Sequence, residues 1–84
     1  MTNNLMYTDH ALDQMAKRGI TRDEVRFVLK YGKAQKAPTW HGRTQRWMKQ
    51  EFVRGHEIRV IYVEEFGRTM IVTVMWVYEK EESK

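Results

Sequence analysis

Two residues near the start of the chain, His10 and Arg18, have side chains suited to proton transfer and to phosphate binding. A neutral imidazole can act as a general base. A guanidinium can grip a phosphate through two parallel hydrogen bonds, which a lysine does less well. Helical spacing would place both residues in one polar stripe with Gln14 and Lys17. The alternative is a structural role for this stripe. His10 would then support the start of the helix or hydrogen-bond to a strand, and Arg18 would cap the end of the helix.

Three residues in the second half of the chain could complete such a site. Arg59, Tyr62 and Thr73 would present a guanidinium, a phenol and a hydroxyl beside the helix that carries the histidine. Tyr62 and Thr73 are equally typical packing residues of a sheet. The chain has no Gly-rich phosphate loop and no serine nucleophile motif. If the protein is an enzyme, the chemistry left is metal-free RNA cleavage, in which a base deprotonates a 2′-hydroxyl, cations stabilise the phosphorane and an acid protonates the leaving oxygen.

The length and composition of the chain indicate which cofactors it could bind and in which part of the cell it is expected. The 84 residues suffice for one domain with a modest core and leave no room for a separate cofactor domain. The chain has no cysteine, and His41 and His56 lack the spacing of metal ligands, so we expect neither a metal nor another cofactor. No apolar run reaches membrane-spanning length and the first residues are polar, so we expect a cytoplasmic protein without membrane contact.

Basic residues are concentrated in one part of the chain. Residues 17–49 contain ten Lys or Arg and two acidic residues, whereas residues 50–84 contain five basic and seven acidic ones. This concentration favours an anionic partner, most simply RNA or another nucleic acid, and a solvated basic surface is the alternative. Aromatic side chains between the cations could stack on single-stranded bases. The candidate nucleic-acid contacts are Lys17, Arg22, Arg26, Lys30, Trp40, His41, Arg43 and Arg46.

Two helices are predicted in the first half of the chain, over about residues 9–18 and 22–31. Thr8 can cap the first helix, and Gly19 is suited to end it. Thr21 and Glu24 have the spacing of a capping box for the second helix. The two helices are therefore expected to follow each other closely.

Three strands are predicted after the helices, over about residues 43–53, 56–64 and 69–78. The turns between them are short, so the strands are expected to pair antiparallel. Residues 33–42 are expected to form an extended connection or an irregular edge strand. The last strand is apolar on both faces and is therefore expected to be central or covered on both sides. Together the elements predict a single α+β domain over residues 1–84, with both helices on one face of a three- to four-stranded antiparallel sheet and a frayed tail over 79–84.

The helix pattern resembles a known family of small bacterial domains. It comprises His10-Ala11-Leu12, Met15 and Arg18-Gly19-Ile20-Thr21, and a closing strand Ile71-Val72-Thr73-Val74 accompanies it. Over about residues 5–77 the chain resembles the domain-of-unknown-function family numbered 4258, which looks like a distant relative of RelE-like toxins and of the barnase- and EndoU-like ribonuclease fold group. The resemblance implies a RelE-like α+β fold and a toxin-type ribonuclease, with His10, Arg18 and Thr73 at the characteristic positions. The chain departs from the pattern at Gln14, where that family often has an arginine.

Three functions remain open from the sequence. The first is a metal-free endoribonuclease of toxin type, which implies an antitoxin or another acidic protein as partner. The second is a non-catalytic module that binds nucleic acid or a protein through the cationic ridge Arg22, Arg26 and Lys30 and the loop around Trp40. The third is an interaction or inhibitor protein, which could form a homodimer through the apolar third strand.

Overall fold

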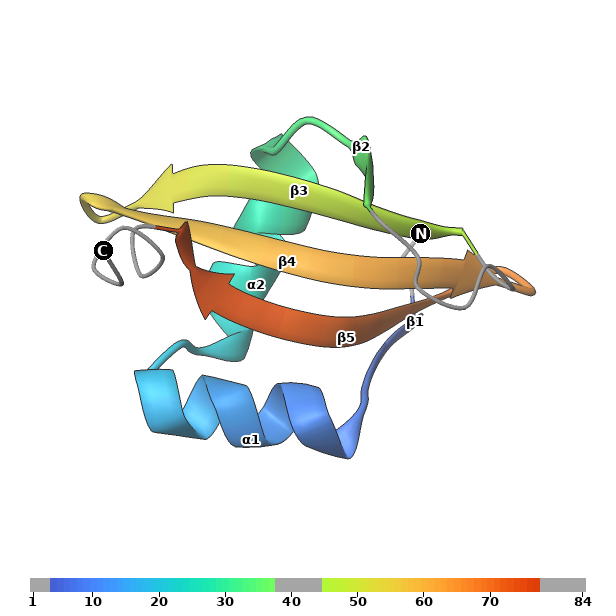
Figure 1. Ribbon diagram of the computed structural model, residues 1–84, viewed down its shortest axis with the longest axis horizontal. Coiled ribbons are helices and arrows are strands. Elements are labelled where there is room, and N and C mark those ends of the chain that lie inside the picture. Colours follow the sequence, from blue (N-terminus) through green and yellow to red (C-terminus); the bar gives the residue numbers. More distant parts are fainter. Residues whose placement is uncertain (1–3, 38–44, 78–84) are drawn as a thin grey trace.

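The computed structural model describes residues 4–37 and 45–77, and in these it contains two helices and five strands (Figure 1). The helices have the predicted ranges. The elements in chain order are β1 (Asn4–Tyr7), α1 (Asp9–Arg18), α2 (Arg22–Tyr31), β2 (Gln35–Ala37), β3 (Arg46–Val53), β4 (His56–Glu65) and β5 (Arg68–Trp76).

The predicted helix caps are all present. The Thr8 hydroxyl accepts a hydrogen bond from the backbone N–H of Ala11 at 3.0 Å, which satisfies one amide at the start of α1. Gly19 ends α1 in the left-handed conformation, with φ of 69°. Thr21 and Glu24 form a capping box at the start of α2, in which each side chain accepts from the other residue's backbone N–H. Local sequence therefore defines both helices.

The sheet differs from the expected one in strand number and in direction. It has five strands in the order β1-β5-β4-β3-β2, rather than three or four. β1 pairs with β5 in parallel, so the sheet is not wholly antiparallel. β1 and β2 are four and three residues long, which is too short for an alternating pattern to be recognised. β2 occupies part of the segment that was expected to be a connection or an irregular edge strand, and it forms one edge of the sheet.

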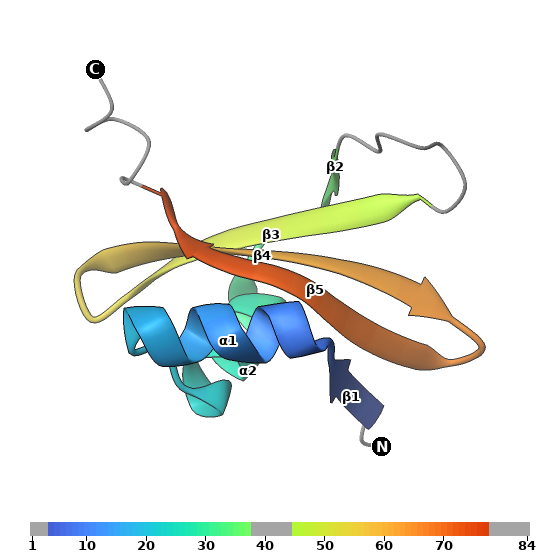
Figure 2. The ribbon, with the colours of Figure 1, turned by 60° about the horizontal axis from the view of Figure 1, so that its bottom comes forward.

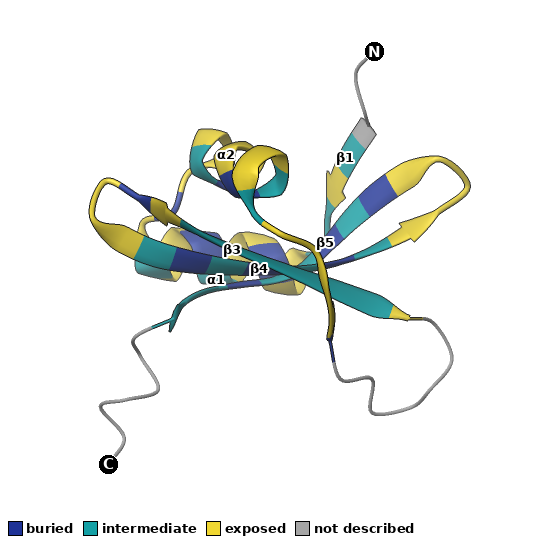
Figure 3. Ribbon diagram, turned by 90° about the horizontal axis from the view of Figure 1, so that it is seen from above, coloured by how far each residue is buried: buried dark blue, intermediate teal, exposed yellow. Residues whose placement is uncertain are grey.

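Both helices lie on one face of the sheet, as predicted (Figure 2). α1 lies beside β5, and α2 lies across β3 and β4. Buried positions occur at the centre of the sheet and on the sides of the helices that face it, whereas exposed residues cover the outer side of α2 (Figure 3). The fully buried core side chains are Ala11 and Val25 and Val28 of the helices, Ile58 and Val60 of β4, and Ile71 and Val74 of β5. No described helix is long and apolar enough to cross a membrane.

An irregularity in β5 changes which of its side chains share a face. Ile61 pairs with Thr73, but the next residue, Tyr62, pairs with Ile71, so Val72 is an extra residue in β5. Strict alternation along a strand would place Ile71 and Val74 on opposite faces. The bulge instead buries both side chains completely in the same core. Thr73 pairs with Ile61 on the opposite face, which the helices do not cover.

β5 lies between β1 and β4, and β4 is the middle strand. The apolar character of β5 fits this interior position. Its predicted end at residue 78 lies outside the described residues, as do residues 43 and 44 of the first predicted strand and the tail over 79–84.

Candidate functional site

The sheet face opposite the helices carries polar and charged side chains that could take part in a reaction or bind a ligand. Because successive side chains of a strand point to opposite faces, every second residue of β3, β4 and β5 lies on this uncovered face. Most of these residues are half-buried, and several are apolar. The uncovered face comprises Arg46, Met48, Gln50 and Phe52 of β3, Glu57, Arg59, Ile61 and Val63 of β4, and Thr73 and Met75 of β5.

A row of three polar side chains crosses the uncovered face between β3 and β4. Arg59 Nε donates to Gln50 Oε1 at 2.7 Å, and Gln50 Nε2 donates to Glu57 Oε2 at 3.2 Å. Gln50 and Arg59 are also direct cross-strand partners. The hydrogen bond at Nε fixes the plane of the guanidinium, which leaves its two terminal nitrogens held in a defined direction. This polar row therefore orients a cation and a carboxylate on the open side of the sheet.

Helix α1 lies on the covered side of the sheet and runs along the edge of β5 that β4 does not occupy. The Thr8 N–H donates to the Ile71 carbonyl at 3.0 Å, where β1 stops pairing with β5. Further along, the backbone N–H of Val74 donates to Gln14 Oε1 at 3.2 Å. Gln14 thus accepts a hydrogen bond from a part of the β5 edge with which β1 does not pair. The bond attaches one side of α1 to β5 midway between His10 and Arg18.

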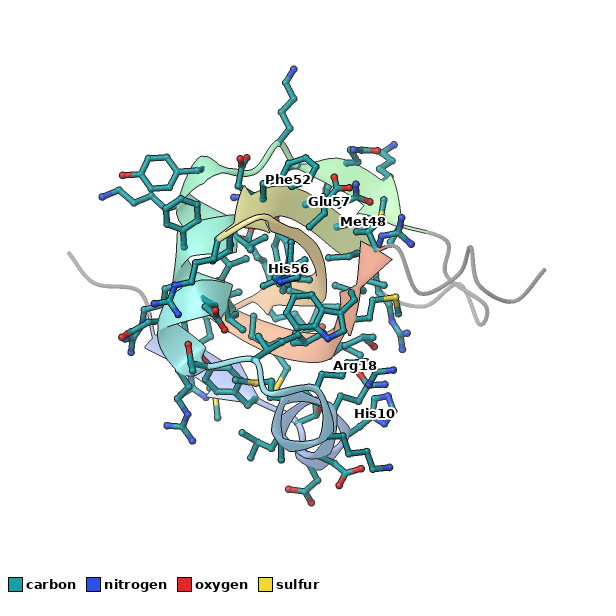
Figure 4. The ribbon with its side chains drawn as sticks, turned by 90° about the vertical axis from the view of Figure 1, so that its left-hand side faces the viewer. His10, Arg18, Met48, Phe52, His56 and Glu57 are labelled. Carbon is teal, nitrogen blue, oxygen red and sulfur yellow. The ribbon has the colours of Figure 1, made fainter. Side chains whose placement is uncertain are left out.

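His10 and Arg18 lie on either side of Gln14 along the helix. Figure 4 shows both side chains extending to the same side of the molecule as Met48 and Glu57, away from α2. His10 is exposed and Arg18 is half-buried. Eight residues of helix separate them by about 12 Å, so they flank a stretch of surface and do not meet at one atom. We call His10, Gln14 and Arg18 the α1 row.

Of the five predicted catalytic residues, His10 and Arg18 lie on α1, Arg59 and Thr73 lie on the uncovered face of the sheet, and Tyr62 lies on the covered face. The strand register gives Arg59 and Thr73 the same face as Gln50 and Ile61, respectively. Tyr62 lies on the covered face, where it is 4% exposed and belongs to the core. Burial raises the pKa of the Tyr62 phenol, and the nearby Glu64 carboxylate raises it further. This position gives Tyr62 a packing role.

The predicted nucleic-acid contacts are divided between two surfaces. Arg46 lies on the uncovered face, and Lys17 pairs with Asp13 on the exposed side of α1 at 3.3 Å. Arg22, Arg26 and Lys30, the three cations of the ridge, lie on α2, on the other side of the sheet. Arg22 stacks over the Tyr7 ring at 5.1 Å, Arg26 pairs with Asp23 at 3.5 Å, and Lys30 lies 5.4 Å from the centre of the Tyr31 ring. Trp40, His41 and Arg43 lie outside the described residues.

The His, Asp and Glu side chains and the surface hollows of the described part of the chain bear on whether the site could hold a metal or a small ligand. Within residues 4–37 and 45–77, no three His, Asp or Glu side chains are placed to hold a metal ion together. A hollow of about 240 Å³ lies at the β4–β5 turn and is lined by Glu64, Glu65, Phe66, Gly67, Arg68 and Thr69. It is formed by the turn itself and includes none of the candidate catalytic residues.

Sequence reasoning missed three residues of the uncovered face, Gln50, Phe52 and Glu57. Gln50 and Phe52 alternate with Met48 along β3, and this spacing already places them on one face. Their partners on β4 depend on the register of the β3–β4 hairpin. Gln14 was identified as a departure from the resembled pattern, but its bond to Val74 depends on how α1 docks against β5.

Comparison with known proteins identifies the family. No curated protein and no solved structure matches the chain. A sequence profile with the description "Domain of unknown function (DUF4258)" matches residues 7–76. This range contains the α1 row and every residue of the uncovered face named above. The chain therefore belongs to the DUF4258 family of domains of unknown function.

Proposed function

We propose that the protein is a metal-free endoribonuclease of RelE-like toxin type, with its site formed by the uncovered face and the α1 row. One observation carries the proposal: His10 and Arg18 extend to the same side of the molecule as Met48 and Glu57 (Figure 4), and the register of β3 and β4 places the oriented Arg59 on the sheet face that carries these two residues. The same face offers half-buried apolar side chains on which RNA bases could rest.

The reaction needs two proton transfers and cations at the phosphate. In the proposed step, His10 removes the proton of a ribose 2′-hydroxyl, and the 2′-oxygen attacks the adjacent phosphorus. Arg59 stabilises the negative charge of the phosphorane, and Arg18, about 12 Å along α1 from His10, binds a neighbouring phosphate of the same strand. The 5′-oxygen leaves with a proton from a water molecule, because Tyr62 is buried on the other face, and the resulting hydroxide takes back the proton held by His10. The products are a 2′,3′-cyclic phosphate and a 5′-hydroxyl.

The product ends and the metal dependence test this chemistry. A labelled single-stranded RNA is incubated with the protein in excess EDTA, and the fragments are analysed for cyclic phosphate ends. We expect cleavage with these ends, and no cleavage at positions where the ribose is 2′-deoxy, because the nucleophile is then missing. Fragments with 5′-phosphate ends, or an intact RNA, would overturn the proposal.

A non-catalytic binding module is the second candidate, and the outer surface of α2 favours it. Phe27 and Tyr31 are 41% and 57% exposed on this helix, and their ring centres are 4.7 Å apart. Arg26 and Lys30 lie beside them. Exposed aromatic rings next to cations suit an acidic protein partner, such as an antitoxin, or a nucleic acid. Pull-down with an acidic partner that depends on Phe27 and Lys30, without RNA cleavage, would support this function instead.

A homodimer through β5 would have to use the uncovered face. β4 pairs with one edge of β5, and β1 and α1 occupy the other edge. Met70 and Met75 are half-buried on β5 and remain available for such a contact. The solution mass at high protein concentration tests this arrangement.

A further inference from the structure

Phe52 and Glu57 face each other across the β3–β4 hairpin on the uncovered face. Phe52 is 60% exposed, although it lies within a strand and not in a turn. Glu57 is half-buried beside it. An exposed aromatic ring adjacent to a carboxylate offers both a stacking surface and a hydrogen-bond acceptor.

The polar row fixes the carboxylate of Glu57. Gln50 is hydrogen-bonded at both ends of its amide, since Oε1 accepts from Arg59 and Nε2 donates to Glu57. Its orientation is therefore determined by its neighbours. The bond from Gln50 uses one acceptor position of Glu57 Oε2, and an ionised carboxylate has about four such positions. Glu57 can thus accept further hydrogen bonds in a fixed place.

We infer that Phe52 and Glu57 form a subsite for a guanine base of single-stranded RNA. Guanine carries two adjacent donors on its Watson–Crick edge, the N1–H and the N2 amino group, and a carboxylate can accept both at once. Adenine and cytosine present a single amino donor on that edge, and uracil presents a single imino donor. The base must be unpaired, because both its edge and its face are used.

The position of Arg59 agrees with a nucleotide bound in this way. Arg59 lies two residues from Glu57 on the same face of β4, a separation of about 7 Å. With its base at the hairpin, a nucleotide would direct its phosphate toward this guanidinium. The β3–β4 turn and the Arg18 end of α1 lie at the same end of the sheet (Figure 1). The subsite therefore deepens the proposed ribonuclease function and rests on it, because it would select the base next to the cleaved bond.

The opposite end of the sheet provides matched controls. Phe66 is 96% exposed at the β4–β5 turn, and Glu65 precedes it. Phe66 lies in the turn with φ of 52°, so its ring is not part of the sheet face. Glu65 pairs across the turn with Arg68, so a glutamate and an arginine are also neighbours at this end of the sheet. A phenylalanine and a glutamate are therefore present at this end of the sheet as well, but without the polar row.

Nucleotide titrations followed by NMR test the subsite. The four 5′-monophosphates GMP, AMP, CMP and UMP are titrated separately into the full-length protein. We expect GMP to bind about tenfold more tightly than the others, and Glu57→Gln to remove this preference. Phe52→Leu should weaken all four nucleotides, because the stacking surface is sequence-tolerant. Glu65→Gln and Phe66→Leu should change neither the affinity nor the preference.

The outcomes separate this inference from the proposed function. Equal affinity for the four nucleotides, or a loss of GMP binding in Glu65→Gln instead of Glu57→Gln, would overturn the guanine subsite. Amide spectra of each variant establish that it is folded before its affinity is compared. RNA cleavage without a preference for guanine would refute the subsite and leave the ribonuclease proposal standing. Selective GMP binding without RNA cleavage would support the subsite and remove the ribonuclease.

Discussion

At the scale of single residues, Gln14 combines a structural role with a position in the candidate site. Its side-chain oxygen accepts the Val74 N–H at the part of the β5 edge that β1 does not reach. An arginine at this position would carry donors only and could not accept that hydrogen bond. The glutamine thus supports the attachment of α1 to the sheet, and the cations of the site are left to Arg18 and Arg59.

Replacing Gln14 should therefore lower stability more than replacing an exposed neighbour. Gln14→Ala leaves the Val74 N–H without its partner, and we expect the free energy of unfolding to fall by about 1–2 kcal/mol. Lys17→Ala, on the exposed side of the same helix, should change it by less than about 0.5 kcal/mol. Urea unfolding followed by circular dichroism measures both variants. Equal stability of Gln14→Ala and the unmodified protein would refute the role of this bond.

Tyr62 provides a second prediction at this scale. Burial raises its pKa above that of an exposed tyrosine, so the folded protein retains the phenol proton at a pH where the unfolded chain loses it. Stability should therefore fall as the pH rises above about 10. Tyr62→Phe should reduce this loss, as followed by unfolding at several alkaline pH values, and should leave RNA cleavage unchanged at neutral pH. Loss of cleavage in a folded Tyr62→Phe protein would restore Tyr62 to the mechanism.

At the scale of elements, local signals predicted the helices and tertiary contacts decided the sheet. Thr8, Gly19, Thr21 and Glu24 bond to backbone groups a few residues away, so their roles can be recognised from the sequence. The parallel pairing of β1 with β5 joins segments more than sixty residues apart. The bulge at Val72 likewise depends on packing against β4. For the same reason the sequence predicted the α1 row and the candidates Arg59 and Thr73 on the sheet, but not Gln50, Phe52 and Glu57, whose neighbours depend on the register of the β3–β4 hairpin.

Gly32 links two of these elements. It ends α2 and lies against β3, where an added Cβ would be 2.7 Å from the Val28 carbonyl oxygen and 2.9 Å from the Gln50 carbonyl oxygen. Both are backbone atoms and cannot move aside independently. We expect Gly32→Ala to lower the free energy of unfolding by about 1–3 kcal/mol, measured by urea unfolding. Lys33→Ala is the control at the next, exposed position, and a Gly32→Ala protein as stable as this control would contradict the close approach.

At the scale of the whole molecule, the cations occupy two surfaces that face in different directions. Arg46 and Arg59 lie on the uncovered face, whereas Arg22 and Arg26 lie on α2, behind the sheet. In the proposed function, RNA binds to the uncovered face. We expect Arg46→Gln with Arg59→Gln to weaken RNA binding and to reduce the slope of log affinity against log salt by about 1.4, because two phosphate contacts are lost.

The paired variant on α2 distinguishes the two surfaces. Arg22→Gln with Arg26→Gln removes the same charge and should leave the affinity for RNA and its salt slope nearly unchanged. Fluorescence anisotropy with a labelled oligonucleotide at several salt concentrations measures both pairs. A larger effect of the α2 pair would place the nucleic acid on the helical side and favour the binding module over the ribonuclease.

The role of His10 in catalysis is tested most directly by the rate of RNA cleavage by His10→Ala in excess EDTA, compared with the unmodified protein. If His10 transfers a proton in the reaction, the rate should fall by about 10² to 10⁴-fold while the protein remains folded. His56→Ala, which alters an exposed histidine outside the α1 row, should retain most of the activity. Cleavage by His10→Ala at the rate of the unmodified protein would contradict the proposed mechanism.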